Sequence, residues 1–121
     1  MHLDFTGKRI LITGGSQGIG KGCAELLASF GAHVHINYAG NQSAAEATAA
    51  QLQAAGGTVT VHQADLGNED AVNRMWQAAN ADAPIDYLIL NAAYQKKATV
   101  DETDRALLEN TMAVNIYGNF Q

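Results

Sequence analysis

Cysteine is almost absent from this chain of 121 residues, and the single one, Cys23, cannot form an internal disulfide. It stands among apolar residues of a predicted helix, so we interpret it as a small buried side chain rather than a nucleophile. Residues 1–5 also lack the apolar stretch of about 7 to 15 residues found in secretory signals. We therefore expect a cytoplasmic protein.

Long apolar runs and basic clusters are missing as well. No run approaches the roughly 20 apolar residues that span a bilayer, so a soluble protein without a membrane partner is expected. The formal net charge is -5, with 7 Lys and Arg against 12 Asp and Glu, and nowhere do the basic residues gather. Nucleic acid is therefore not an expected partner, because its phosphates need concentrated positive charge.

Charged residues make up only 16% of the sequence, while hydrophobic residues make up 47%. This composition favours a sheet that is buried on both faces. The length suits one domain, 1–121, and the chain has no internal repeats, linkers or low-complexity tracts. One compact domain is predicted.

Short apolar segments alternate with amphipathic ones along the whole chain. Strands are predicted at 9–13, 33–38, 58–61 and 85–90, and helices at 19–30, 43–55, 72–79 and 103–120. Ser43 and Glu46 form a predicted capping box at the start of the second helix. Strands separated by helices imply right-handed crossovers and a parallel sheet. We predict a Rossmann-type, doubly wound α/β fold of strand order 3-2-1-4, with helices on both faces and ligands at the carboxyl ends of strands one and four.

A glycine-rich loop, residues 13–20, lies between the first strand and the first helix. Backbone N–H groups and the helix dipole at such a position together bind a pyrophosphate. Gly14 allows a sharp turn, Gly18 lets the backbone approach phosphate oxygens, and Gly20 permits close packing of the helix. The loop therefore predicts a nucleotide site.

Two other nucleotide loops fit less well. The spacing G-x-G-x-x-G fails, because Cys23 stands where the last glycine is required. The phosphate loop of nucleotide triphosphatases matches at Gly15, Gly20 and Lys21, but Gly22 replaces the Ser or Thr that binds magnesium. A triphosphatase remains the weaker alternative.

The loop reads T-G-x-x-x-G-I-G, which resembles the cofactor loop of the short-chain dehydrogenase/reductase family, and the resemblance covers nearly the whole chain. It implies an oxidoreductase that transfers hydride between NAD(P)(H) and a small carbonyl or alcohol substrate. The implied cofactor contacts in the loop are Gly14, Ser16, Gln17, Gly18, Ile19 and Gly20. After the third strand, Asp65 is similar to the family's adenine-contacting acidic residue, with Leu66 beside it.

Two further stretches are similar to family motifs. The family's N-N-A-G stands here as Leu90-Asn91-Ala92-Ala93, with the first Asn and the Gly changed. The resemblance implies that Asn91, Ala92 and Ala93 run beside the nicotinamide ribose. Ala93, in place of the family's glycine, is expected to narrow the approach of the cofactor. Asn115 is similar to a helix asparagine that helps to hold a water near the catalytic lysine; an ordinary polar helix residue is the alternative.

The choice of nucleotide depends on the end of the second strand. NAD-preferring relatives carry an acidic residue there, and this chain has Tyr38. Without that carboxylate, the small polar side chains of Asn37 and Asn41 and the backbone amides of residues 39–41 suit a 2′-phosphate, so NADP(H) is expected in preference to NAD(H). Gln17 departs from the Arg or Lys common in phosphate-binding relatives. Locally, residues 36–41 loosely resemble β-ketoacyl carrier-protein reductases and sugar or alcohol dehydrogenases.

The family's catalytic residues do not occur here by motif. The resemblance implies a serine, a tyrosine and a lysine four residues after the tyrosine, but none of the four tyrosines has lysine at that spacing. We therefore expect an incomplete version of a reductase, truncated in the last helix and inactive on its own. A non-catalytic dinucleotide-binding module is the alternative.

Two smaller features complete the sequence picture. The apolar segment 85–90 is expected to form an open sheet edge, which favours a homo-oligomer. His33 and His35 share one face of a strand, and His62 lies on the next strand, so a metal site is conceivable. We expect no metal there, because solvated or capped imidazoles are commoner.

Overall fold

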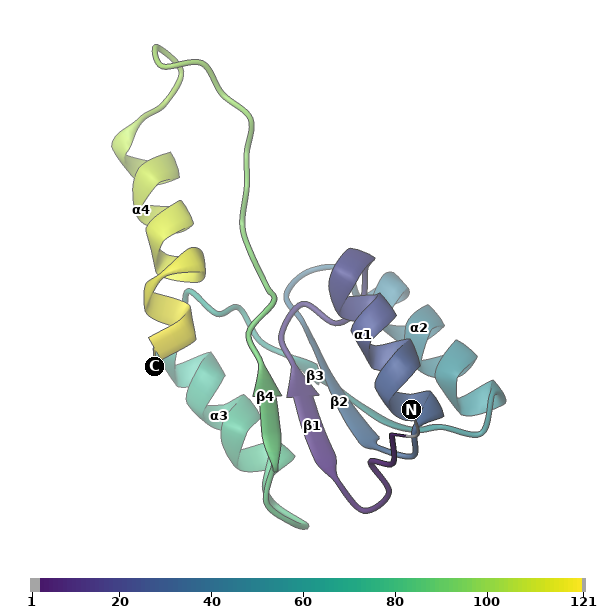
Figure 1. Ribbon diagram of the computed structural model, residues 1–121. Coiled ribbons are helices and arrows are strands. Elements are labelled where there is room, and N and C mark those ends of the chain that lie inside the picture. Colours follow the sequence, from purple (N-terminus) through teal and green to yellow (C-terminus); the bar gives the residue numbers. More distant parts are fainter. Residues whose placement is uncertain (1–2, 121) are drawn as a thin grey trace.

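Four parallel strands form the centre of the molecule in the computed structural model, which describes residues 3–120 (Figure 1). They are β1 (Arg9–Ile12), β2 (His33–Tyr38), β3 (Thr58–Gln63) and β4 (Tyr87–Ile89), in the order β3-β2-β1-β4. This order confirms the prediction of a Rossmann-type doubly wound sheet, and it places β4 at an edge.

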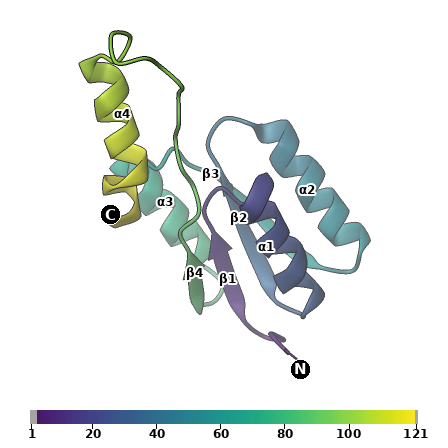
Figure 2. The same ribbon diagram turned by 45° about the horizontal axis from the view of Figure 1, so that its top comes forward.

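The helices cover both faces of the sheet, as predicted. They are α1 (Gly18–Ser29), α2 (Gln42–Ala54), α3 (Glu69–Ala79) and α4 (Arg105–Asn115), followed by the 3₁₀ turn η1 (Tyr117–Phe120). Figures 1 and 2 show α1 and α2 against one face and α3 against the other, while α4 extends beyond the sheet. Within residues 3–120, no helix is both long and apolar enough to cross a membrane.

Alternation along β1 divides the core in two. Ile10 and Ile12 pack with Ala24 of α1 on one face, and Leu11 packs with Met75 of α3 on the other. All three β1 side chains are buried, because helices cover both sides of this inner strand. The carboxyl end of β1 is thereby held in the middle of the molecule.

The predicted capping box at the start of α2 is wrong. Asn41, not Ser43, caps the helix, and its Oδ1 accepts the Ala44 N–H at 3.1 Å. Glu46 instead accepts a hydrogen bond from the Gln42 side chain at 2.7 Å. Asn is among the best cap residues, and at position 41 its oxygen reaches the N–H three residues later, so the helix begins before Ser43.

The predicted single helix over 103–120 is also wrong. Asp104 caps α4, the helix ends at Asn115, and a separate 3₁₀ turn follows. In that turn Gly118 packs on the backbone of Leu66, where an added Cβ would collide with the carbonyl. Helical periodicity gave no sign of this contact, which packs the turn against the segment after β3.

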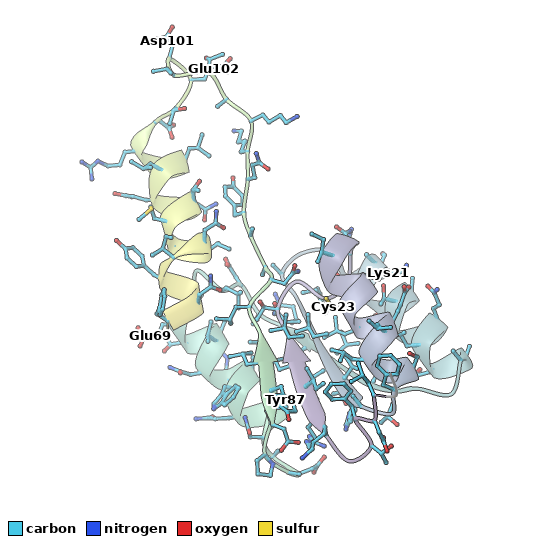
Figure 3. All side chains as sticks on the ribbon, in the orientation of Figure 1. Lys21, Cys23, Glu69, Tyr87, Asp101 and Glu102 are labelled. Atoms are coloured by element: carbon cyan, nitrogen blue, oxygen red, sulfur yellow. The ribbon has the colours of Figure 1, made fainter. Side chains whose placement is uncertain are left out.

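A long segment between β4 and α4 leaves the sheet and returns. Its far tip carries Asp101 and Glu102, which lie well away from the strands (Figure 3). β4 itself covers only Tyr87–Ile89, less than the predicted 85–90, because it pairs with just Ile10–Ile12 of β1.

Candidate functional site

A cleft of about 480 Å³ lies at the carboxyl ends of the strands. The residues expected at a cofactor that line it are Gly14, Ser16, Gln17, Tyr38, Asn41, Asp65, Leu66, Asn91, Ala92 and Ala93. Sequence analysis did not assign Ala64, Tyr94, Asn110 or Val114 to the site, although they also line the cleft. These four carry no motif signal, and the tertiary fold alone places them there.

The glycine-rich loop packs tightly against the end of β4. Gly14 has a φ of 64°, and a Cβ on it would lie 2.9 Å from the Ala92 Cα. A Cβ on Gly20 would collide with the Gly14 carbonyl oxygen and lie 2.5 Å from Nδ2 of Asn91. Glycine at both positions therefore lets the loop, the start of α1 and the end of β4 meet.

The first turn of α1 contains the remaining loop residues, which do not line the cleft. Gly18 begins the helix with a φ of 56°, in open space. Ile19 is 81% exposed and does not line the cleft. Sequence analysis grouped Gly18, Ile19 and Gly20 with the cofactor contacts; they are the first three residues of α1, and their contact with a cofactor stays a prediction.

The amino end of α1 differs from the other helix starts in residues 3–120. The α2, α3 and α4 helices are capped by Asn41, Asn68 and Asp104, whereas the Gln17 side chain makes no capping hydrogen bond. The first turn of α1 also contains no acidic residue. The first N–H groups of α1 and the positive end of its dipole are thus left for an anion.

Thr13 and Asn91 join β1 to β4 beneath the cleft. The Thr13 hydroxyl oxygen accepts the N–H groups of Asn91 at 3.0 Å and Ala92 at 3.1 Å. In return, Nδ2 of Asn91 donates to the carbonyl oxygens of Thr13 at 3.2 Å and Gly14 at 3.1 Å. These bonds fix the start of the loop, and the role of Thr13 was not predicted.

Two buried side chains, Asn37 and Thr48, hold the loop from beneath. Oδ1 of Asn37 accepts the Gly14 N–H at 3.2 Å, and the Thr48 hydroxyl donates to the Ser16 carbonyl at 3.0 Å. Sequence analysis placed Asn37 among small polar phosphate contacts and did not single out Thr48. The available signal was a polar residue on a strand or helix face that is otherwise buried.

The ends of β2 and β3 form the other side of the cleft. Tyr38 is half-buried, and the loop that follows is tied to β3, because Nε2 of Gln63 donates to the Ala39 carbonyl at 2.8 Å. The Asn41 oxygen is occupied by its capping bond. Asp65 is exposed, and one carboxylate oxygen accepts the Gly67 N–H at 2.9 Å.

Asn115 does not itself line the cleft, but it is hydrogen-bonded to Tyr94, which does. Its Oδ1 accepts the Tyr94 N–H at 2.6 Å, and its Nδ2 donates to the Tyr94 carbonyl at 2.9 Å. This pair holds the segment after β4 against the end of α4. The predicted link between Asn115 and a catalytic water stays a prediction.

A histidine cluster lies outside the cleft. The rings of His33 and His35 stack with centroids 4.2 Å apart, and Nδ1 of His35 lies 2.9 Å from Nε2 of His62. Burial lowers the pKa of His35 to about 3, and repulsion from His33, Arg9 and His62 adds to the effect. Nowhere in residues 3–120 are three or more His, Cys, Asp or Glu side chains grouped to hold a metal ion.

The fold and the cleft define a class of protein: a Rossmann-like α/β protein whose first helix presents free N–H groups at the carboxyl ends of its strands. The chain belongs to the short chain dehydrogenase family, which it matches over residues 8–121.

Curated relatives are similar over most of the chain. The short-chain dehydrogenase/reductase homolog YusS of Bacillus subtilis is 37% identical over 105 residues, which are 86% of this chain and 96% of the relative. The uncharacterized oxidoreductase YgfF of Escherichia coli is 36% identical over 91% of this chain, but over only 45% of its own length. The chain thus spans nearly all of one relative and less than half of the other.

Solved structures share the same fold. A dehydrogenase/reductase from Sinorhizobium meliloti aligns with a TM-score of 0.91 and 31% identity, over 98% of this chain and 48% of the other. A short chain dehydrogenase from Burkholderia cenocepacia in complex with NADP aligns with a TM-score of 0.89 and 32% identity, over 96% of this chain and 48% of that one. The chain therefore spans about half the length of these structures.

Proposed function

We propose that this chain binds a nicotinamide dinucleotide in the cleft, and NADP(H) in preference to NAD(H). The observation that carries the proposal is the uncapped amino end of α1 beside the glycine-rich loop. Gly14 and Gly20 support the proposal as well, because the lack of side chains there lets the loop and the start of α1 pack against Asn91 and Ala92. When bound, the dinucleotide supplies or accepts a hydride.

Each part of the dinucleotide has proposed partners in this chain. Ser16, Gln17 and the first N–H groups of α1 would hold the pyrophosphate, and Asp65 and Leu66 would contact the adenine. Residues 91–93 would run beside the nicotinamide ribose. The family resemblance suggests these assignments, and the lining of one continuous cleft supports them.

The proposed preference for NADP(H) rests on the loop between β2 and α2. Residues 38–41 contain no carboxylate that would repel a 2′-phosphate. The first turn of α2 also lacks acidic residues, so the positive end of its dipole is not neutralised there. The Burkholderia cenocepacia relative in complex with NADP is in keeping with this preference.

We further propose that the dinucleotide serves hydride transfer with a carbonyl or alcohol, and that the serine, tyrosine and lysine of the family mechanism must come from outside these residues. None of the four tyrosines here has lysine four positions later. The residues of this chain would then bind and orient the dinucleotide. A non-catalytic binding module is the second candidate, favoured by the same lack of a tyrosine and lysine pair.

Calorimetric titration of the chain with NADP⁺ and with NAD⁺ tests the proposal. We expect saturable binding of both, tighter for NADP⁺ by about tenfold, since one well-placed phosphate contact contributes about that factor. Equal affinities would refute the preference, and binding of neither would refute the function. NADPH oxidation with a panel of aldehydes and ketones separates the two candidates.

A phosphate-loop triphosphatase is tested in the same preparation. That activity needs a hydroxyl ligand for magnesium, and Gly22 stands at its place. We expect no magnesium-dependent ATP hydrolysis above a no-protein blank. If the wild type hydrolyses ATP and a Lys21→Ala variant does not, the triphosphatase function would be favoured over dinucleotide binding.

A further inference from the structure

Asn37 lies at the floor of the cleft, and its side chain is turned into the protein rather than into solvent. The residue is only 2% exposed. We propose that its carboxamide is a positioning group, which sets the affinity for the dinucleotide by fixing the glycine-rich loop against the end of β3. This inference rests on the proposed function and names a residue on which that function depends.

The carboxamide joins two parts of the chain that are distant in sequence. Oδ1 accepts the Gly14 N–H at 3.2 Å, and Nδ2 donates to the Ala64 carbonyl at 3.1 Å. The Asn37 backbone carbonyl accepts the Gly15 N–H at 3.1 Å. One residue of β2 therefore holds both the first turn of the loop and the end of β3.

The two parts held by Asn37 are the two sides of the proposed dinucleotide site. Gly14 opens the loop that would hold the pyrophosphate, and Ala64 directly precedes Asp65 on the adenine side. A dinucleotide must bridge both sides, so its affinity depends on their separation. An error of about 1 Å in such positioning is costly even where no ligand contact is lost.

The chemistry of the two partners explains why a carboxamide is required. Asn37 faces a donor, the Gly14 N–H, on one side and an acceptor, the Ala64 carbonyl, on the other. A carboxylate of the same shape would place an oxygen, in place of Nδ2, against the Ala64 carbonyl oxygen, whereas a neutral carboxylic acid has one acceptor and one O–H donor. The Asn37→Asp variant is therefore a carboxamide mimic only when it is protonated.

The loop keeps a second anchor when Asn37 is changed. The Thr48 hydroxyl donates to the Ser16 carbonyl from α2, and neither residue is hydrogen-bonded to the Asn37 side chain. We therefore expect Asn37→Asp to fold with a displaced loop rather than to unfold.

The test compares NADP⁺ binding by wild type and Asn37→Asp, titrated calorimetrically at about pH 8 and about pH 5, where a buried carboxyl with a raised pKa passes from charged to neutral. At the higher pH we expect the variant to bind about tenfold more weakly than wild type, the worth of one displaced buried hydrogen bond. At the lower pH the ratio of the two dissociation constants should return toward one. The protonation of NADP⁺ itself changes between the two pH values, but it affects both proteins equally and cancels in the ratio of their dissociation constants.

His35→Gln is the matched control. His35 is also 2% exposed and lies on the same strand and face, two residues earlier, but it does not line the cleft. We expect this variant to lose thermal stability while its affinity ratio to wild type stays near one at both pH values. A loss of affinity equal to that of Asn37→Asp would mean that any damage to β2 has this effect, which would overturn the proposal.

The other outcomes are separable. Wild type that binds neither NADP⁺ nor NAD⁺ overturns the proposed function and this inference with it. Two outcomes overturn the inference alone, provided that wild type binds the dinucleotide. In the first, Asn37→Asp binds as tightly as wild type at the higher pH. In the second, Asn37→Asp binds more weakly than wild type by the same factor at both pH values. If the variant does not fold, amide hydrogen exchange of the wild type tests the inference. Slow exchange of the Gly14 N–H supports a positioning role for Asn37, and fast exchange of that N–H overturns it.

Discussion

Gly20 shows how one missing side chain shapes the cleft. A Cβ there would meet the Gly14 carbonyl and lie 2.5 Å from Nδ2 of Asn91, and Asn91 is itself hydrogen-bonded to the loop. We expect Gly20→Ala to lower the free energy of unfolding by about 1 to 3 kcal/mol, the usual cost of overpacking. Urea unfolding measures this loss of stability.

Gly22, two residues further along α1, provides the control for Gly20→Ala. An added Cβ there meets nothing within 4 Å. In an exposed helical position alanine is more favourable than glycine, so Gly22→Ala should raise stability by about 0.5 to 1 kcal/mol. Equal stabilities of the two variants would contradict the steric account.

The histidine cluster predicts a loss of stability in mild acid. Burial, followed by repulsion from neighbouring cationic groups, lowers the pKa of His35 from 6.5 to about 3. The same causes lower the pKa of His62. Below about pH 6.5 the unfolded chain therefore binds protons that the folded chain does not, and the free energy of unfolding falls as the pH decreases toward 3.

Urea unfolding at several pH values between about 7 and 4 measures this dependence. Carboxylates contribute a background that is common to all variants, so the comparison is with His35→Gln, which removes the most strongly shifted histidine. We expect a shallower decline in the variant. Parallel curves would show that His35 does not drive the acid response.

At the scale of the element, the amino end of α1 is the feature that fits an anion. Gln17 lies there without a capping bond and lines the cleft. Gln17→Arg would add a charge-assisted hydrogen bond to a phosphate, and we expect NADP⁺ to bind about three- to tenfold more tightly at low salt. Calorimetric titration at two salt concentrations measures both the gain and its screening.

Gln53→Arg is the control for Gln17→Arg, because it adds the same charge at an exposed position near the carboxyl end of α2. It should leave the affinity unchanged. A similar gain from both variants would mean that net charge alone, rather than the start of α1, attracts the dinucleotide.

For the whole molecule, β4 is an edge strand whose apolar side chains are exposed. Tyr87 and Leu88 of this strand are 50% and 46% exposed, and Figure 3 shows Tyr87 on the edge strand. Leu90 and Trp76 nearby are also exposed and line a groove of about 170 Å³. Exposed apolar edge strands favour pairing, so we propose that two copies associate through β4.

Sedimentation equilibrium measures this association. We expect concentration-dependent dimers of the wild type and a shift toward monomer in Leu88→Lys, since charge on an edge strand opposes pairing. Leu26→Lys changes a leucine on α1 that is 57% exposed, against 46% for Leu88, and should not alter the equilibrium. A wild type that stays monomeric throughout would refute association through β4.

Local pattern by itself determined the sheet order, the helices on both faces and the segment that forms the cleft. Strand alternation, helical periodicity and the glycine-rich loop each involve residues that are close together in sequence, so the elements that they form can be predicted without the tertiary structure. Parallel strands bring their carboxyl ends to one edge, which is why Gly14, Asp65 and Asn91 could be expected to meet there.

Tertiary structure alone decided how those segments are held together. The bonds from Asn37 to Gly14 and Ala64, and the pairing of Asn115 with Tyr94, join residues 21 or more positions apart. The contact of Gly118 with Leu66 likewise joins the turn after α4 to the segment after β3. Such contacts depend on the packing of whole elements, and a buried polar group takes whichever partner the fold brings within reach, so no local pattern could specify them.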